Sequence, residues 1–564
     1  MQYIFKKSIF HILLFTFILS SSCKNDIPYY NGMVSSAHPI ASQIGLDILK
    51  NGGNAFDAAI AVHFALAVVY PQAGNLGGGG FVVYRLSNGE NGTLDFREKA
   101  PSMSSRDMYL TKSGEELIVN NNNSRLGHLA SGVPGSVDGM LKLYEKFSTK
   151  RWEELLSPSI HYADNGFKIT KKQSIGLNNV KESFEKVNDN PIPFVKETKW
   201  KEGDILIQKD LAKTLIRIRD NKRHGFYSGK TADLIVKEMD SGNGIINHKD
   251  LQNYSSIWRE PIIGNYKGHK IISMGPPSSG GIALLQLLHG ADQHKTINYG
   301  HNTSEYVNLL SEIESRVYAD RASYLGDIDY YDVPKSSLLD KNYLNEKFRK
   351  IKNNTKTPSS EIKSGNIIIN ESEETTHFSI VDKEGNAVAI TTTINSSFGS
   401  KVVVDGAGFL LNNEMDDFSI KPGFPNMFGL VGGEANAIEP NKRMLSSMTP
   451  TIVEKDNNLF MVVGTPGGST IITSVFQTIL NVIDFKMGMQ EAVDAKRFHH
   501  QWLPDALIVE KNTLSYKSSK KLNDLGHKIT ERNSIGRMDC ILINEDKTLE
   551  GGADKRGDNL ALGY

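Results

Sequence analysis

The hydroxyl of Thr375 lies where a polar stretch of the sequence gives way to a strongly β-forming one. The stretch before it, TKTPSSEIKSGNIIINESEE, has no regular pattern, whereas TTHFSIVDKEGNAVAITTTIN follows directly. Cleavage of the bond before Thr375 would turn an internal hydroxyl into an N-terminal one, and an N-terminal threonine can act as a nucleophile. The alternative is that Thr375 only opens a strand, which is what the hairpin by itself favours.

Other residues could bind or stabilise negative charge. Gly467 and Gly468 precede a long apolar helix in GTPGGSTIITSVFQTILNVIDF, where amide N–H groups and the positive end of the helix dipole attract anions. A tight turn without a ligand would explain these glycines equally well. Arg97 lies near a strand end between Asp95 and Glu98, where a structural ion pair is the more ordinary role.

Several elements must position these groups. Strands in THFSIVD and AVAITTTIN predict a hairpin around KEGN, and FVVYRL with TLDFREKAP predicts a strand pair leading to Arg97. HPIASQIGLDILKNGG predicts a helix that ends at Gly52. NAFDAAIAVHFALAVVYP predicts a helix capped by Asn54 and stopped by Pro71, apolar on nearly every face and therefore buried between layers.

The four glycines of NLGGGGF, at 75–81, require a backbone that bends sharply or approaches another segment closely. They lack the Gly-Lys-Ser/Thr of a P-loop, so they do not indicate a nucleotide site. Residues 150–350 read mainly as helices, interrupted by strands and a Pro-Pro-Ser-Ser-Gly-Gly turn, and contain no catalytic motif. We expect them to form a helical layer.

Composition excludes some classes of function. The 564 residues include 64 Lys+Arg and 64 Asp+Glu, so neither a basic nucleic-acid surface nor an acidic tail is indicated. The length alone would suggest about three or four domains. Because no repeat or linker marks a boundary, one large domain of intertwined halves fits as well. The only two cysteines, Cys23 and Cys540, cannot form a cysteine-based metal site. Adjacent histidines, His499 and His500, cannot share one face, so we expect no metal site and no cofactor.

The N-terminus is predicted to be an export signal. Lys6 and Lys7 precede the apolar run SIFHILLFTFIL, which is too short to span a bilayer comfortably, and SSSC follows. This pattern resembles a loose bacterial lipobox, with residues 1–22 removed and Cys23 lipidated. Cleavage without lipid is the alternative. Either way we expect a protein exported to the bacterial periplasm or envelope, in contact with a membrane only through such an anchor.

A series of motifs in shared order resembles the γ-glutamyltransferase (γ-glutamyltranspeptidase) family over nearly all of the chain after the signal. The motifs are NGGNAFDAAIA, PQAGNLGGGGF, DFREKAP, GVPGSV, PPSSGG, TTHFSIVDKEGNAVA, NNEMDDFS, LSSMTPTIV and GTPGGS…FHHQWLP. The resemblance implies an α+β fold, the four-layer αββα sandwich of N-terminal nucleophile hydrolases. It also implies one precursor that cuts itself into intertwined large (24–374) and small (375–564) subunits, which stay together as a heterodimer.

The same resemblance implies residue roles. Cleavage between Glu374 and Thr375 would make Thr375 the nucleophile, supported by the hydroxyl of Thr393. The Gly467–Gly468 pair would form the oxyanion hole. The remaining matches are implied to hold the α-amino and α-carboxylate groups of a γ-glutamyl substrate such as glutathione: Arg97, Asn395, Glu414, Asp417, Ser446 and Ser447.

The chemistry is compatible with these roles. An N-terminal α-amine has a pKa near ~7.7–8.0, so it is partly neutral at physiological pH and can take the proton of the Thr375 hydroxyl. Two departures from some bacterial members stand out: Phe428 replaces a tyrosine in the loop that closes over the glutamate site, which puts that closure in doubt, and position 414 is Glu instead of Gln.

Two other hypotheses stay open. A cephalosporin or glutaryl acylase would share the fold and the self-cleavage but read a different side chain. A non-catalytic envelope lipoprotein would keep the fold and bind ligands only. Arg97, Asp417 and the serine pair suit a free α-amino acid, which favours γ-glutamyl transfer to amino acids, peptides or water; intact Thr375 and Thr393 disfavour the non-catalytic alternative.

Overall fold

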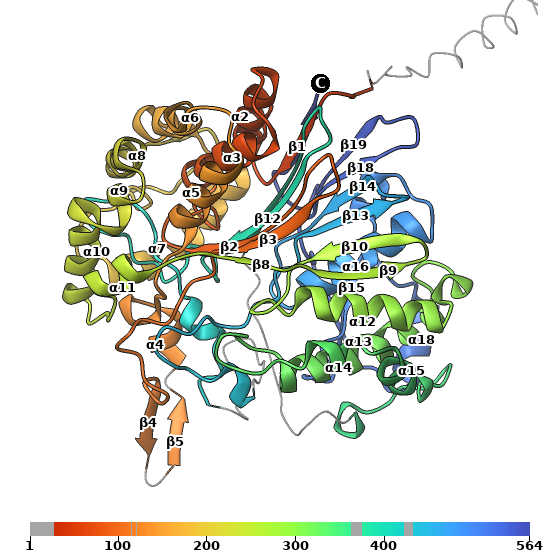
Figure 1. The fold of residues 1–564 in the computed structure, drawn as a ribbon. Helices are drawn as coiled ribbons and strands as arrows, with labels where there is room; N and C mark the ends of the chain where they lie inside the picture. Colours follow the sequence, from red (N-terminus) through yellow and green to blue (C-terminus); the bar gives the residue numbers. More distant parts are fainter. Residues whose placement is uncertain (1–27, 114–115, 120, 363–374, 422–432) are drawn as a thin grey trace, which may run out of the picture.

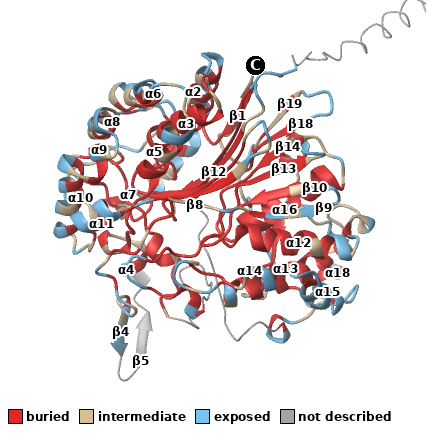
Figure 2. Ribbon diagram, in the orientation of Figure 1, coloured by how far each residue is buried: buried red, intermediate tan, exposed pale blue. Residues whose placement is uncertain are grey.

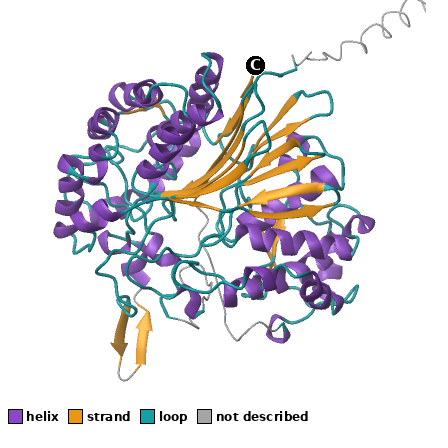
Figure 3. Cartoon of the chain, in the orientation of Figure 1, coloured by secondary structure: helices purple, strands orange, loops and turns teal. Residues whose placement is uncertain are grey.

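The computed structural model describes residues 28–113, 116–119, 121–362, 375–421 and 433–564. Two antiparallel β-sheets lie face to face at its centre, and helices cover the outer face of each sheet (Figures 1 and 3). This arrangement is the predicted four-layer αββα sandwich. The signal segment 1–22, Cys23, Glu374 and Phe428 lie outside the described residues.

The first sheet has seven strands, each antiparallel to its neighbours. In spatial order these are β20 (Leu560–Gly563), β1 (Met33–Ser36), β11 (Thr375–Val381), β12 (Ala387–Thr393), β2 (Gly79–Arg85), β3 (Asn91–Asp95) and β8 (Ile257–Arg259). Strands from before and after residue 375 are interleaved in it. Neither part of the chain therefore forms this sheet alone.

The second sheet has six strands, also antiparallel throughout. In spatial order these are β19 (Leu549–Ala553), β18 (Asp539–Ile543), β14 (Asn458–Val463), β13 (Thr451–Lys455), β10 (His269–Ser273) and β9 (Ile262–Tyr266). Alternation along β2 builds the core: Phe81 and Val83 join the apolar layer between the sheets, while Val82 and Tyr84 face the helices. Figure 2 shows this interior as the most buried part of the molecule.

The first outer layer covers the seven-stranded sheet. Its helices are α2 (Pro39–Lys50), α3 (Ala55–Val69), α5 (Ser136–Phe147), α6 (Trp152–Asn165), α7 (Lys171–Val187), α8 (Lys209–Asn221), α9 (His224–Tyr227), α10 (Gly229–Ser241) and α11 (His248–Asn253). Every residue of α3 is buried, and Asn54 caps it in a reciprocal capping box with Asp57. The prediction of a buried, Asn54-capped helix is confirmed.

The second outer layer covers the six-stranded sheet. Its helices are α12 (Gly280–Gln293), α13 (Ser304–Tyr324), α14 (Lys335–Leu338), α15 (Lys341–Arg349), α16 (Thr470–Ile483), α17 (Met489–Asp494) and α18 (Tyr516–Asp524). The expectation that residues 150–350 form a single helical layer is therefore wrong. Strands β8, β9 and β10 carry the chain from one outer layer to the other, so this segment contributes helices to both.

Short elements complete the described chain. They are β4 (Leu110–Ser113) and β5 (Glu116–Val119), which form a hairpin that projects from the body (Figure 1), α4 (Asn121–Arg125), β6 (Phe167–Lys168), β7 (Ile205–Leu206), β15 (Phe498–His499), β16 (Leu507–Glu510) and β17 (Ile529–Arg532). Within the described ranges, no helix has the length and apolarity needed to cross a membrane.

The predicted hairpin forms β11 and β12, and its register sets Thr375 directly opposite Thr393. On the other side of β12, the glycine run lies against the same threonine: a Cβ on Gly78 would come within 2.1 Å of the Thr393 carbonyl oxygen. None of the glycines at 77–80 has a positive φ, so their backbone conformation does not require glycine. They are required because other backbone segments approach them too closely for a side chain. The run therefore decides where the end of β12 lies.

Replacing Gly78 with alanine is expected to push the end of β12 away, because the added methyl group overlaps the Thr393 carbonyl. Overpacking of this kind typically costs about 1–3 kcal/mol of unfolding free energy, measurable by urea denaturation. Gly176→Ala in α7 is the control, since its Cβ would meet nothing closer than 3.8 Å. Equal stability of the two variants would contradict the assignment.

Candidate active site

Thr375 begins β11, and its side chain lines a small cavity of about 20 Å³. The residues around this cavity come from distant parts of the chain: Arg97, Thr375, Thr393, Asn395, Asp417, Ser446, Ser447, Met448, Gly468 and Ile471. All the site residues named from the sequence are among them except Gly467, Glu414 and Glu374. Gly467 lines a neighbouring cavity, Glu414 lies behind Arg97, and Glu374 is outside the described residues.

Hydrogen bonds fix the side of the cavity opposite Thr375. The Thr393 hydroxyl accepts the Asn395 amide N–H at 2.7 Å, and Asn395 has a positive φ of 68°. Asn395 Nδ2 in turn donates to the Asn413 carbonyl at 2.9 Å. Asn75, which starts the glycine run, donates from Nδ2 to the Thr393 carbonyl at 3.0 Å. These bonds hold the Thr393 hydroxyl beside Thr375.

Arg97 supplies the cationic wall of the cavity and is only 1% exposed. It lies just beyond β3, where its amide N–H donates to Asp95 Oδ1 at 2.9 Å. Its guanidinium pairs with Glu414 Oε2 at 2.6 Å, Asp417 Oδ2 at 2.5 Å and Glu98 Oε2 at 3.4 Å. The short 3₁₀ turn Glu414–Asp417 brings both of its acidic ends to one guanidinium.

Burial and charge set the protonation of this cluster. Burial alone would lower the pKa of Arg97, but the carboxylates of Glu414, Glu98 and Asp417 raise it above its ordinary value. Burial raises the pKa of Glu414 well above normal against the pull of Arg97, and raises the pKa of Glu98 to about 8. Arg97 therefore stays charged, while Glu98 and Glu414 tend to keep their protons.

The wall formed by Ser446 and Ser447 is held in place by the turn before α12, for which no site was predicted. The Ser446 carbonyl accepts from both the amide and the hydroxyl of Ser279, at 2.8 and 2.7 Å. Arg321 Nε donates to the same hydroxyl at 2.9 Å. Ser279 belongs to the Pro-Pro-Ser-Ser-Gly-Gly turn before α12, and the unusual run of small residues in this turn is the feature of the sequence that marks it.

The glycine turn forms the remaining wall. Gly467 and Gly468 have φ values of 137° and 55°, a backbone conformation that residues other than glycine rarely adopt. Their amide N–H groups donate to no acceptor in the part of the chain that the structure describes. They lie directly before the 14-residue helix α16, so the positive end of its dipole faces the same space. The turn is suited to stabilise an oxyanion.

His377, two residues after Thr375, was not considered from the sequence. Its Nε2 meets Ser379 Oγ at 3.1 Å, and that hydroxyl donates to the Asp539 carbonyl, so Nε2 carries the proton. Its Nδ1 then accepts from Thr391 Oγ1 at 2.9 Å. Burial lowers the pKa of His377 to about 3. Both ring nitrogens are occupied, so His377 braces β11 and does not serve as the base for Thr375.

The adjacent histidines each contact a nearby polar side chain. His499 Nδ1 is 2.8 Å from Thr473 Oγ1, and His500 Nε2 is 3.3 Å from Asp505 Oδ1. Across the described residues, no group of three or more His, Cys, Asp or Glu side chains is arranged to hold a metal ion. Cys540 is a buried free thiol in β18.

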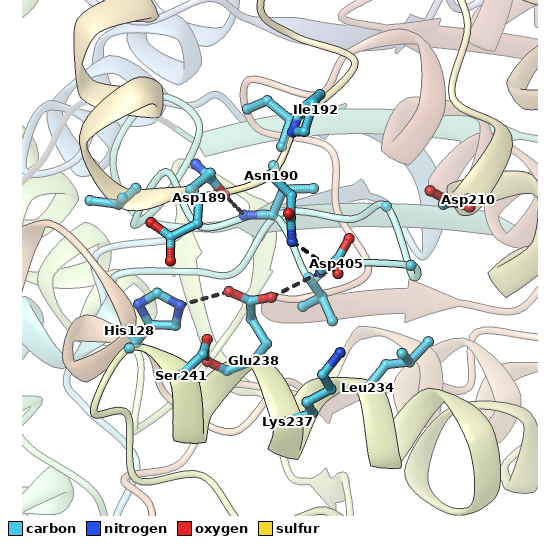
Figure 4. Close-up of a pocket in the computed structure, with 18 of the residues that line it drawn as sticks. His128, Asp189, Asn190, Ile192, Asp210, Leu234, Lys237, Glu238, Ser241 and Asp405 are labelled. Carbon is cyan, nitrogen blue, oxygen red and sulfur yellow. Dashed lines mark hydrogen bonds and ion pairs between the residues drawn. The ribbon is translucent and has the colours of Figure 1, made fainter.

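A larger cavity of about 760 Å³ lies elsewhere, between α7, α8, α10 and the loop after β12 (Figure 4). Its polar groups largely bind one another: His128 Nε2 meets Glu238 Oε1 at 2.8 Å, and Glu238 Oε2 accepts the Asp405 amide at 3.0 Å. Asn190 Nδ2 reaches Asp405 Oδ2 at 3.2 Å. None of the predicted site residues lines it, so size alone does not identify the active site.

The raised pKa of Glu98 predicts a pH effect. Between its ordinary 4.5 and about 8 the folded chain holds a proton that the unfolded chain has lost, so the unfolding free energy falls as pH rises. Glu98→Gln removes this contribution and should gain stability relative to the parent protein from about pH 5 to pH 8. Urea denaturation across that range, with exposed Glu90→Gln as the control, checks it; parallel curves for Glu98→Gln and the parent would contradict it.

Comparison with known proteins agrees with this geometry. The gamma-glutamyltranspeptidase family model matches residues 41–564. A glutathione hydrolase proenzyme of Escherichia coli is 45% identical over 94% of this chain and 92% of its own. In a crystal structure of Helicobacter pylori gamma-glutamyltranspeptidase, one chain is 45% identical, with a TM-score of 0.57 over 58% of this chain and 94% of that one.

A cephalosporin acylase from Bacillus halodurans superposes with a TM-score of 0.81 over 95% of this chain and 96% of that chain. At 24% identity this likeness concerns the fold alone. The family match and the E. coli relative, by contrast, extend over nearly the whole sequence. The chain belongs to the gamma-glutamyltranspeptidase family.

Proposed function

We propose that this protein is an exported precursor that cuts itself between Glu374 and Thr375 and then transfers γ-glutamyl groups from glutathione and related compounds to amino acids, peptides or water. One observation carries the proposal beyond family membership. The ion pair between buried Arg97 and partly exposed Asp417 borders the same cavity as the Thr375 hydroxyl. A cation and an anion side by side match the two charges of a free α-amino acid end.

The charged head of the substrate is proposed to enter by ion-pair exchange. A cavity of about 20 Å³ has room for about one water molecule, so the charged end of a glutamyl group needs Arg97 and Asp417 to separate before it can enter. The α-carboxylate of the substrate binds the Arg97 guanidinium, and the α-ammonium of the substrate binds the Asp417 carboxylate. Asn395 and Glu414 complete the ammonium site, while the hydroxyls of Ser446 and Ser447 bind the carboxylate.

The chemical step needs only this chain's own groups. Thr375 Oγ attacks the γ-carbonyl carbon, and its proton passes to the α-amine that cleavage has created. The resulting oxyanion accepts hydrogen bonds from the Gly467 and Gly468 amides. Collapse breaks the amide bond, and the leaving amine takes the proton from the Thr375 ammonium. Water or an acceptor amine then attacks the γ-glutamyl ester by the reverse route.

The Thr375 nitrogen and His377 together explain why activity depends on cleavage. In the uncut chain the Thr375 nitrogen is an amide, which is not a base, and His377 cannot replace it because both ring nitrogens are occupied. Only cleavage supplies a basic group next to the hydroxyl. The two products should stay associated, since strands from both sides of residue 375 pair with one another in each sheet and are interleaved in the seven-stranded one.

The alternative function is a cephalosporin or glutaryl acylase. A glutaryl group has the same length as γ-glutamyl but lacks the α-ammonium, so it would leave Asp417 without a cationic partner once Arg97 binds its carboxylate. Leaving a buried charge unpaired is strongly unfavourable. The cluster around Arg97 therefore favours the γ-glutamyl substrate.

Thr375→Ala should remain a single uncut chain without activity, because it removes the nucleophile of both reactions. Thr375→Ser, which keeps a hydroxyl, is the control and should still be cut. Denaturing electrophoresis and N-terminal sequencing of the smaller parent fragment should give Thr-Thr-His-Phe. Cleavage of the alanine variant, or a different N-terminus, would contradict the assignment.

We also propose that the larger fragment in the same sample begins at a lipid-modified Cys23. Mass spectrometry of that fragment tests this, and an unmodified mass would exclude the anchor.

Asp417→Asn should discriminate between the two enzymatic functions. The parent enzyme is expected to hydrolyse γ-glutamyl-p-nitroanilide far faster than glutaryl-p-nitroanilide. The variant keeps the shape but loses the ammonium's counter-charge, a charge-assisted contact of about 1.5–3 kcal/mol, so kcat/KM for the γ-glutamyl substrate should fall ~10- to 100-fold. Asp405→Asn, on an exposed loop, is the matched control. Preference of the parent for the glutaryl substrate would favour an acylase.

A further inference from the structure

One helix from the part of the chain before residue 375, α13, lies behind two walls of the Thr375 cavity. It packs with α12 and α16 against the six-stranded sheet (Figure 1), and every residue from 304 to 322 is buried except Glu305. Tyr318 and Arg321 are three residues apart, so they lie on one face of this helix. Each is at most 3% exposed. Both side chains carry hydrogen-bond donors into the interior of the molecule.

Tyr318 contacts the glycine turn from behind. Its hydroxyl donates to the carbonyl of Ser469, which directly follows Gly467 and Gly468 and precedes α16. The Thr470 amide donates to the Gly467 carbonyl at 3.0 Å, so the glycine turn and the start of α16 form one hydrogen-bonded unit. A contact that holds Ser469 therefore also fixes the direction of the two glycine amides.

Arg321 reaches the wall formed by Ser446 and Ser447 through one hydroxyl. Arg321 Nε donates to Ser279 Oγ at 2.9 Å, and that hydroxyl donates its only proton to the Ser446 carbonyl at 2.7 Å. The Ser446 amide donates to the Pro277 carbonyl at 3.0 Å. The turn before α12 thus holds the backbone of Ser446 on both sides, and Arg321 fixes the orientation of the hydroxyl that it uses.

Arg321 keeps its charge in this buried position. Burial lowers the pKa of Arg321 to about 10, against the opposing effects of Tyr318 and Asp417. The guanidinium is therefore protonated at physiological pH and remains a donor to the Ser279 hydroxyl. Neither Tyr318 nor Arg321 lines the cavity of Thr375, so neither touches the reacting atoms.

We propose that α13 positions two walls of the active site independently. Tyr318 positions the Gly467–Gly468 amides through the Ser469 carbonyl. Arg321 positions Ser446 through the Ser279 hydroxyl. The inference rests on the proposed function, in which the glycine amides stabilise the oxyanion and the serines bind the α-carboxylate.

The two contacts should affect different constants of the reaction. The oxyanion exists only around the transition state, so a misplaced amide slows the chemical step without weakening substrate binding. The α-carboxylate is bound in the ground state and in the transition state alike, so a misplaced serine weakens binding without slowing the chemical step. A purely structural role for α13 would not separate the two constants in this way.

Tyr318→Phe removes one oxygen atom and tests the first contact. On chain already cut before Thr375, the acylation rate constant for γ-glutamyl-p-nitroanilide should fall ~10- to 100-fold, with KM within about twofold. The rate constant is read from the exponential release of p-nitroaniline with enzyme in saturating excess, since it then does not depend on the fraction of active molecules. Tyr324→Phe, at the partly exposed end of the same helix, is the control and should match the parent.

Ser279→Ala and Arg321→Lys test the second contact. Each should raise KM by ~10-fold, the size of one charge-assisted hydrogen bond, and leave the acylation rate constant within about twofold. Lysine keeps the charge but not the planar geometry of the guanidinium. The double variant should be no worse than the worse single one, because both changes break the same contact. Ser241→Ala, at an exposed position of α10, is the control.

The separation of the two constants decides the inference. It is overturned if Tyr318→Phe keeps the parent's acylation rate constant, or if Ser279→Ala and Arg321→Lys keep the parent's KM. It is also overturned if variants of both contacts change the same constant, or if the effects of Ser279→Ala and Arg321→Lys on KM multiply. Absence of p-nitroaniline release by the cut parent enzyme would instead overturn the proposed γ-glutamyl function.

Discussion

One guanidinium, that of Arg97, is enclosed by protein and surrounded by carboxyl groups, and the rest of the site depends on how that charge is balanced. Burying a charge without a partner is prohibitive, so the chain must supply the Asp417 carboxylate from a turn more than three hundred residues later. The turn can reach Arg97 only because β12 and β3 belong to one sheet. The ion pair therefore ties the substrate-binding groups to the strand order of the fold.

The same constraint keeps the cavity beside Thr375 small. Arg97 and Asp417 satisfy each other, which is stable but leaves little space beside Thr375. A ligand that carries both a carboxylate and an ammonium can separate the pair without leaving either charge unpaired, whereas a ligand with one charge cannot. The proposed selectivity for a free α-amino acid thus follows from the Arg97–Asp417 ion pair itself. The glycine run beside β12 and the glycine turn before α16 fix the reacting groups around it.

Local pattern was enough to predict the elements that carry the site. The apolar faces of α3, the hairpin at Thr375 and the strand pair before Arg97 were all predicted, because each depends on residues close together in sequence. The resemblance named the site residues, which the structure brings around Thr375. The contacts of Ser279 with Ser446 and the network of His377 could not be predicted, since they join segments that meet only in the folded sandwich. The division of residues 150–350 between two layers was missed for the same reason.

A crystal structure of the processed enzyme with L-glutamate bound would test the central claim most directly. We expect the 2.5 Å contact between Arg97 and Asp417 to open, with the ligand's α-carboxylate on Arg97 and its ammonium on Asp417. Its γ-carboxylate should lie next to Thr375 Oγ and the Gly467–Gly468 amides. A closed Arg97–Asp417 pair with glutamate bound elsewhere, or a ligand whose γ-carboxylate points away from Thr375, would contradict it.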